Sequence, residues 1–140
     1  MKKHEYSDPQ AAAWASYQRM RVRLTGRINR ELARATGLSE ADFEILFALT
    51  EVPDESVRAM ALRCGLEWEK SRLSHQLRRM EERGLVMRMD CAEDNRGSIV
   101  RITDAGRKVA AEARQHYDQA VRRYVIDVLT PEQLAALGTI

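Results

Sequence analysis

One stretch of the sequence, residues 65–103, constrains the fold more than any other because it contains an amphipathic segment, a sharp turn and a hairpin pattern. In the first of these, residues 68–83, the apolar side chains Leu73, Leu77 and Met80 recur in steps of four and three. Side chains at these steps share one face of an α-helix. The pattern therefore predicts a helix that buries this face and leaves its other sides in solvent.

The other sides of this predicted helix carry the side-chain types that bind DNA. They hold Lys70, Ser71, Arg72, Ser74, His75, Gln76, Arg78 and Arg79. In the major groove Arg reads guanine and Gln reads adenine, while Ser and Lys reach phosphates. We expect DNA contacts from Lys70, Ser71, Arg72, Ser74, His75, Arg78 and Arg79. Taken alone, a solvated amphipathic helix explains the same pattern. Trp68 is expected to pack at the turn rather than stack on a base.

A polar turn between two β-rich runs predicts a hairpin directly after the helix. Gly84 is the expected left-handed end of the helix, and the two runs are residues 85–89 and 99–102. Arg96 lies at the hairpin tip, where it can enter the minor groove beside the helix. Asp94 is expected to brace this tip, by pairing with an arginine or by capping the turn. The hairpin therefore favours DNA binding over a merely solvated helix.

Three phrases in this stretch resemble the winged-helix core of MarR-type transcriptional regulators. They are L-x-x-M-E-E-R-G-L-V at residues 77–86, D-N-R-G at residues 94–97 and I-T-D-A-G at residues 102–106. Met80 and Ile102 stand where the family usually has Leu, and both differences preserve apolar character and volume. The resemblance extends over nearly the whole chain, and the order and spacing of its phrases make it specific.

The resemblance implies a mainly α (α+β) fold, a winged helix-turn-helix with a helical dimerisation arm built from the N- and C-terminal helices. The recognition helix would be residues 68–83 and the wing residues 87–101. The implied divisions are an N-terminal arm with a dimerisation helix, a DNA-binding lobe and C-terminal dimerisation helices, at residues 1–36, 37–102 and 103–140. The implied function is a homodimeric regulator on a near-palindromic duplex operator, most simply a repressor relieved by a small ligand.

Capping patterns mark where further helices begin. Ser39, with Asp42 three residues later, predicts one helix start, Thr103 predicts a second, and residues 130–133 predict a third. Ser56 is expected to cap a short helix over residues 56–64, which supplies the first half of the helix-turn-helix.

Two long helices, expected over residues 11–36 and 103–129, carry apolar faces that a chain of this size has nothing large enough to cover. At about 1.5 Å per residue the second would extend roughly 40 Å. Dimerisation is the economical way to bury such faces. The argument from area and the resemblance therefore predict the same homodimer.

Arg21 lies in the apolar stripe of the first long helix, where a guanidinium needs an acceptor. The interpretation we prefer is a structural ion pair, within the chain or across the dimer. The other is a clamp for an anionic ligand. Regulators of the resembled family often bind small aromatic or anionic compounds between the dimer arm and the DNA-binding lobe. The side chains that would line such a pocket here are Trp14, Tyr17, Arg21, Phe43, His116 and Tyr117.

Composition and motifs narrow the class of protein. A net charge of +2, with 31% charged residues, excludes a histone-like polycation, and 44% hydrophobic residues suffice for a core. No apolar run is long enough to cross a bilayer and no signal peptide is visible, so we expect a cytoplasmic protein without a membrane partner. The chain has no nucleophile elbow, no Gly-rich phosphate loop and no metal-ligand motif, and no enzyme activity, cofactor or metal is predicted.

Two alternatives to a ligand-relieved repressor remain open. One is a redox- or metal-sensing regulator, although Cys64 and Cys91 lack any CxxC or zinc-ligand spacing. We expect Cys64 to be packed and Cys91 to be exposed. The other alternative is a winged helix that binds proteins instead of DNA, which would lack the strong salt dependence of DNA binding.

Overall fold

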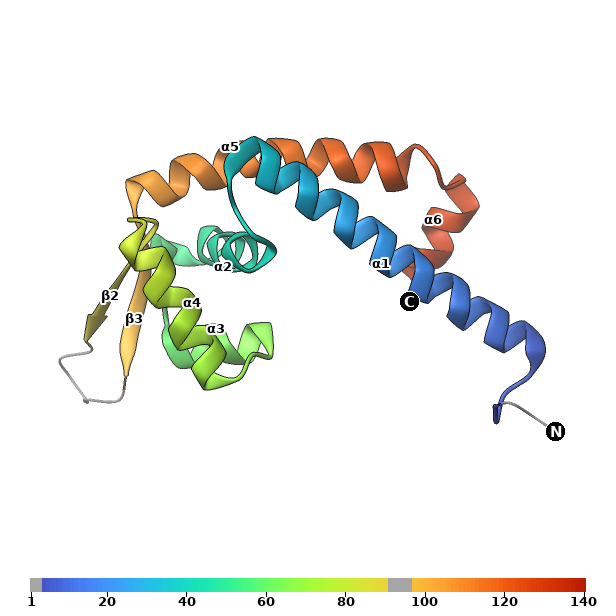
Figure 1. Ribbon diagram of the computed structural model, residues 1–140, viewed down its shortest axis with the longest axis horizontal. Coiled ribbons are helices and arrows are strands. Elements are labelled where there is room, and N and C mark those ends of the chain that lie inside the picture. The colour runs from blue at the N-terminus through green and yellow to red at the C-terminus, as the bar shows by residue number, and fades with distance from the viewer. Residues whose placement is uncertain (1–3, 91–96) are drawn as a thin grey trace. The chain divides into compact units, whose positions relative to one another are not determined.

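The computed structural model describes residues 4–90 and 97–140 of the 140-residue chain. It is mainly helical with one small antiparallel sheet, which confirms the predicted fold class (Figure 1). The chain divides into two compact units, a larger one formed by Leu32–His116 and a smaller one formed by Met1–Glu31 with Tyr117–Ile140.

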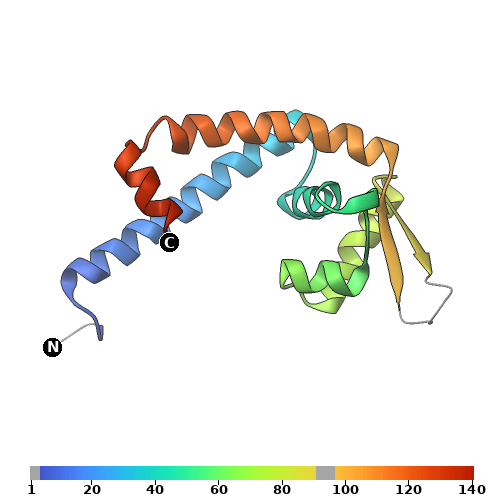
Figure 2. The ribbon, with the colours of Figure 1, turned by 180° about the vertical axis from the view of Figure 1, so that it is seen from behind.

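The larger unit contains the expected helix-turn-helix and a three-stranded sheet. Its elements are α2 (Glu40–Thr50), the 3-10 helix η1 (Pro53–Glu55), β1 (Ser56–Arg58), α3 (Ala59–Leu66), α4 (Lys70–Glu82), β2 (Val86–Asp90), β3 (Ser98–Ile102) and most of α5 (Asp104–Val121). The strands are antiparallel in the order β1-β3-β2, so β3 pairs with both neighbours. Because β2 packs against α4, the hairpin stands beside this helix (Figures 1 and 2).

The core of this unit lies where α2, α4 and the sheet meet. Its fully buried large side chains are Leu32, Leu38, Ile45, Leu46, Leu49, Leu77, Met80, Val86, Val100 and Ile102. Helix α2 begins with the predicted capping box: Ser39 Oγ accepts the Asp42 N–H at 3.1 Å, and Asp42 Oδ2 accepts the Ser39 N–H at 2.9 Å. This pair satisfies two backbone donors at the helix start and anchors α2 on the core.

Two local features join α4, the hairpin and α5. Gly84 has a φ of 73°, which confirms the predicted left-handed end of the helix. The Thr103 hydroxyl donates to the Gly84 carbonyl at 2.5 Å and accepts the Gly106 N–H at 3.0 Å, so Thr103 caps α5 as predicted. Thr103 thus connects Gly84, just after α4, to the first turn of α5.

Ser56 does not cap a helix, and this prediction was wrong. It begins β1 and pairs with Arg101 of β3, while α3 starts only at Ala59. The helix then ends at Leu66, where Glu67 caps it with a φ of 57°, and so extends beyond the predicted last residue, Cys64. Pairing with a distant strand overrides the local preference of serine for a helix cap.

The smaller unit contains most of α1 (Asp8–Thr36), the end of α5, the π-helix η2 (Arg122–Ile126) and α6 (Pro131–Gly138). Glu31 ties η2 to α1, because its carboxylate accepts the Tyr124 hydroxyl at 2.5 Å and the Arg123 guanidinium at 3.3 Å. The long helix expected over residues 103–129 is a regular α-helix only as far as Val121, and the π-helix η2 follows it.

Helix α6 begins as predicted, with a capping box between Thr130 and Gln133 and Pro131 in its first turn. Its apolar side chains are not buried within the chain, and Leu137 is exposed. The smaller unit therefore presents unburied apolar surface on α6.

Candidate nucleic-acid interface

Trp68 packs in the turn between α3 and α4, as predicted. The residue is only 8% exposed, and its backbone N–H donates to the Arg63 carbonyl at 3.1 Å. The preceding residue, Glu67, adopts a left-handed conformation that L-residues rarely hold. This turn fixes the angle at which the chain enters α4.

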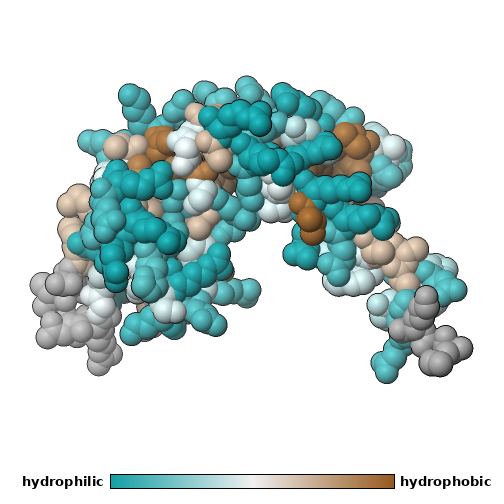
Figure 3. Space-filling view, viewed as in Figure 1, coloured by the Kyte–Doolittle hydropathy of each residue, from teal (hydrophilic) through white to brown (hydrophobic). Residues whose placement is uncertain are grey.

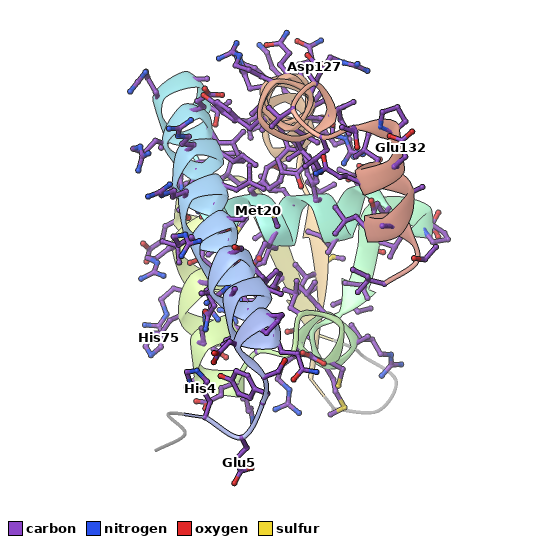
Figure 4. The ribbon with its side chains drawn as sticks, turned by 90° about the vertical axis from the view of Figure 1, so that its right-hand side faces the viewer. His4, Glu5, Met20, His75, Asp127 and Glu132 are labelled. Carbon is purple, nitrogen blue, oxygen red and sulfur yellow. The ribbon has the colours of Figure 1, made fainter. Side chains whose placement is uncertain are left out.

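Helix α4 separates an apolar face from a polar one. Leu73, Leu77 and Met80 are buried, as predicted. The predicted DNA-contacting side chains on the other faces are exposed, apart from the half-buried Ser74; the exposed ones are Lys70, Ser71, Arg72, His75, Arg78 and Arg79. Figure 3 shows hydrophilic residues over α4, and in Figure 4 the side chain of His75 projects outward from it. The helix therefore offers a basic, solvent-facing surface of a size that fits the major groove.

Arg72 lies over the ring of Trp68, with its guanidinium carbon 3.9 Å from the ring centroid. A guanidinium over an indole face is held by cation–π attraction while its N–H groups stay available at the edge. Burial raises the pKa of Glu44 above its ordinary value of 4.5, Glu40 raises it further, and Arg72 opposes both. The contact with Trp68 thus limits the freedom of Arg72 at the first turn of α4.

Gln76 faces the interior, so the suggestion that its amide reads adenine was wrong. It is 4% exposed, and its Nε2 donates to Asp42 Oδ1 at 2.5 Å. Its Oε1 accepts Arg79 Nη2 at 2.7 Å. The wheel position of Gln76, next to Leu73, Leu77 and Met80, already indicated the inner face. Only a partner 34 positions away in the sequence makes a buried amide acceptable there.

Asp42 is the centre of this polar cluster. Besides Ser39 and Gln76, its carboxylate accepts Arg83 Nη1 at 2.7 Å, and Arg83 Nη2 also donates to the Gly37 carbonyl at 3.4 Å. Burial raises the pKa of Asp42, but the Ser39 N–H and the Arg83 guanidinium outweigh it, so the pKa lies below the ordinary 3.8. The ionised carboxylate therefore links the start of α2 to the end of α4.

The hairpin beside α4 is in register from Val86 opposite Ile102 to Asp90 opposite Ser98. Arg88 is tied to α4, since its backbone N–H donates to Glu81 Oε2 at 3.0 Å. The predicted tip residues, Asp94 and Arg96, lie outside the described residues, as does Cys91. The predicted roles of these tip residues are therefore not tested by the geometry.

A pocket of about 370 Å³ lies between α3, α4 and the hairpin. Its lining combines cationic and apolar side chains and consists of Ala59, Met60, Arg63, Lys70, Leu73, Ser74, Leu77, Arg88, Gly97 and Ser98. Met60 is 65% exposed at its rim. The basic surface of α4 is thus continued by Arg63 and Arg88 from the two neighbouring elements.

The residues predicted to line a ligand pocket divide between the two units. In the smaller unit Trp14 and Tyr17 are exposed and stack with ring centroids 5.5 Å apart. Arg21 is also exposed, and its Nη2 donates to Gln18 Oε1 at 3.1 Å. A buried ion pair within one chain was therefore a wrong interpretation of Arg21. Tyr117 is half-buried in this unit.

The other two predicted pocket residues, Phe43 and His116, belong to the larger unit. Phe43 is buried on α2, with its ring centroid 3.6 Å from that of Phe47. His116 is half-buried near the end of the α5 segment of this unit. The ligand-pocket prediction stays a prediction.

Cys64 is exposed, so the expectation that it packs was wrong. Across residues 4–90 and 97–140, no three His, Cys, Asp or Glu side chains gather as a metal site would require. Within the same residues, no helix combines the length and apolar character needed to cross a membrane.

Comparisons with known proteins agree with this architecture. The family model described as "MarR family" matches residues 38–98, which contain α2, α3, α4 and β2 and end at the first residue of β3. AbsC, a MarR family transcriptional regulator from Streptomyces coelicolor, is 33% identical, with 98% of this chain and 92% of that chain covered and a TM-score of 0.90. Sco3205, a MarR family regulator of the same organism solved in complex with DNA, is also 33% identical, with a TM-score of 0.91 and coverage of 97% and 86%.

A curated relative is more distant. YdgJ of Bacillus subtilis, an uncharacterised HTH-type transcriptional regulator, is 24% identical over 98 residues, which span 70% of this chain and 58% of the relative. Together with the coverage of AbsC, these findings show that the chain belongs to the MarR family of transcriptional regulators. Membership of this family of regulators also supports the prediction that the chain is not an enzyme.

Proposed function

We propose that this protein regulates transcription by placing α4 in the major groove of double-stranded DNA. The observation that carries the proposal is the exposed basic surface of α4, with Arg72, Arg78 and Arg79 directed away from the buried face. An α-helix fits the major groove, and arginine forks match guanine edges and phosphates. Sco3205, which shares the fold and is 33% identical, was solved in complex with DNA, and this supports DNA as the partner of the present chain.

The wing is proposed to contact the adjacent minor groove. The hairpin stands beside α4, so a basic side chain at its tip would reach past the edge of the major groove. Arg96 is the proposed contact, and Asp94 is the proposed brace of the wing. Both assignments rest on the sequence pattern at residues 94–97.

The protein is proposed to act as a homodimer. Large apolar side chains are exposed in the smaller unit, and Figure 3 shows hydrophobic residues interrupting the hydrophilic surface along α1. They include Trp14, Tyr17, Met20, Val22, Ile126, Val128 and Leu137. A second copy that covers them would remove this surface from water. In the proposed dimer, residues 1–36 and 103–140 form the dimerisation arm, and residues 37–102 form the DNA-binding lobe.

The regulatory mode we propose is repression in the cytoplasm, relieved by a small aromatic or anionic compound. Support comes from the Trp14–Tyr17 stack and the solvent-accessible guanidinium of Arg21, one turn further along α1. A stacked aromatic pair near a cation suits a planar anion. The remaining proposed pocket residues are Phe43, His116 and Tyr117.

Selection of duplexes from a random-sequence library by the purified full-length protein tests the main proposal. We expect a near-palindrome with half-sites about 10 base pairs apart, as two recognition helices on a dimer axis require. Sedimentation at micromolar concentration should give the dimer mass without DNA. An Arg72→Ala, Arg78→Ala, Arg79→Ala triple variant should keep its helical circular dichroism and lose binding. A library that yields no enriched sequence, or salt-independent binding, would reject the proposal in favour of a protein-interaction module.

A further inference from the structure

Gln76 connects the interior of the larger unit to its basic surface. Its side chain is buried on the inner face of α4, yet its Oε1 accepts Nη2 of the exposed Arg79 at 2.7 Å. Its Nε2 donates to the buried carboxylate of Asp42 at 2.5 Å. A continuous chain of hydrogen bonds therefore runs from the start of α2 to a surface arginine of α4.

The carboxylate determines which way the amide points. Asp42 also accepts the Ser39 N–H at 2.9 Å and Arg83 Nη1 at 2.7 Å, so it is held as an acceptor. An ionised carboxylate cannot donate, and it therefore takes the NH₂ end of the Gln76 amide. The carbonyl end of the Gln76 amide therefore faces Arg79. Reversal of the amide would place two donors together and two acceptors together.

We propose that Gln76, oriented by Asp42, is a positioning residue that holds the Arg79 guanidinium ready for a DNA phosphate. This inference rests on the proposed DNA-binding function of α4. Arg79 lies in the last turns of the helix, whereas base edges are read mainly by the first turns of a recognition helix. A phosphate is therefore the partner that its position favours. One guanidinium nitrogen is used by Gln76, and the others remain to bind an anion.

Restraint of the side chain should strengthen binding because less rotamer freedom is lost when the phosphate arrives. The adjacent Arg78 offers a comparison within the same helix. It is exposed, and no hydrogen bond or ion pair of its side chain is found among residues 4–90 and 97–140. Arg78 thus carries the same charge at a neighbouring position without the restraint.

A double-mutant cycle separates positioning from stability. Gln76→Met keeps the side-chain volume and leaves Asp42 with Ser39 and Arg83, so the fold should persist, as judged by circular dichroism and thermal melting. Affinity for a duplex selected by the wild-type protein should fall roughly threefold to tenfold. In an Arg79→Ala background the same change should have almost no effect on affinity. In the matched Arg78→Ala background the full loss should remain.

A second variant, assayed under conditions in which circular dichroism shows it folded, keeps the inference falsifiable if Gln76→Met does not fold. Asp42→Asn can donate to Gln76 Oε1 and so favours the reversed amide, which turns NH₂ toward Arg79. The same loss, coupled to Arg79 and not to Arg78, is expected. Equal losses in all three backgrounds would show that Gln76 acts through the fold alone and would overturn the inference, as would an unchanged affinity. Failure of the wild-type protein to bind any selected duplex would instead reject the proposed function, and this inference with it.

Discussion

Gly106 lies directly against the backbone of Leu85: a Cβ on Gly106 would fall 2.2 Å from the Leu85 carbonyl oxygen. The same oxygen accepts the Thr103 N–H at 3.1 Å, and Ile102 Cγ1 would be 2.8 Å from the added carbon. The first turn of α5 can approach the start of the hairpin this closely only because residue 106 has no side chain. The contact connects the hairpin to the long helix that follows it.

Gly106→Ala is expected to destabilise the fold, because the methyl group collides with backbone that cannot move cheaply. The free energy of unfolding from urea titration should fall by about 1–3 kcal/mol, the usual cost of overpacking. Gly65→Ala is the matched control, since Gly65 is in α3 with open space around its Cβ position. The control should be neutral or slightly stabilising, in line with the helix propensity of alanine. If Gly106→Ala unfolds at the same urea concentration as the wild type, the close approach of Gly106 to the Leu85 carbonyl is contradicted.

Asp42→Asn is expected to lower stability at pH 7 and to alter its pH dependence. The pKa of Asp42 in the folded state is below its ordinary 3.8, since the Ser39 N–H and Arg83 outweigh the effect of burial. The folded state therefore binds this proton less readily than the unfolded state. Its contribution is present above about pH 3.8 and is lost as the pH falls through the folded-state pKa.

Urea titrations from pH 7 to pH 2 measure this effect. The variant should lose about 1–3 kcal/mol at pH 7, because a charged hydrogen-bond network is broken. Its stability should also decline less steeply than that of the wild type below about pH 4. Glu51→Gln, at an exposed position, serves as the control and should follow the wild-type curve. Parallel acid slopes for Asp42→Asn and the wild type would count against an ionised, buried Asp42.

Arg72→Ala and Arg96→Ala are expected to weaken DNA binding in different ways. Arg72 is in the first turn of α4, held over Trp68, and is the candidate base reader. Its loss should cost about 1–3 kcal/mol at one base position and relax the preference there. Arg96→Ala should weaken binding to all sequences and reduce the salt slope by about 1. Titrations over salt concentration and single-base operator variants distinguish these outcomes, and equal, sequence-independent losses would remove Arg72 from the base readers.

Arg21→Met is expected to weaken the dimer without unfolding the protomer. Within one chain Arg21 is exposed and bonded to Gln18, so no buried acceptor depends on it. If Arg21 forms an ion pair across the proposed dimer interface, its replacement should cost about 2–5 kcal/mol of dimerisation free energy. Sedimentation over a dilution series measures the change. An unchanged dimer, together with loss of DNA release by salicylate-like anions, would favour the anion clamp instead.

Local patterns predicted the helix ends that depend on neighbours in the sequence. The capping boxes at Ser39 and Thr130, the left-handed Gly84 and the Thr103 cap all involve groups no more than a few residues apart. The apolar spacing in α4 likewise predicted its buried face. Such features are readable because helical geometry brings residues three and four apart together whatever the rest of the chain does.

Prediction failed for two residues whose environment is set by a partner far away in the sequence. Ser56 has the chemistry of a helix cap, but its neighbour is Arg101 on β3. Gln76 has the chemistry of a base reader, but its amide is buried and hydrogen-bonded to Asp42. In both cases the residue type was compatible with two environments, and strand pairing or a buried charge selected one.

The sequence by itself determined the helical periodicity, the caps and the family phrases that identify a winged helix. Tertiary structure decided which polar side chains remain on the surface of α4 and which become part of its support. The physical reason is the cost of burying an unpaired polar group: an amide such as Gln76 can enter the core only if an acceptor such as Asp42 waits there. That condition joins residues far apart in the chain, and it exists only once α2 and α4 have packed together.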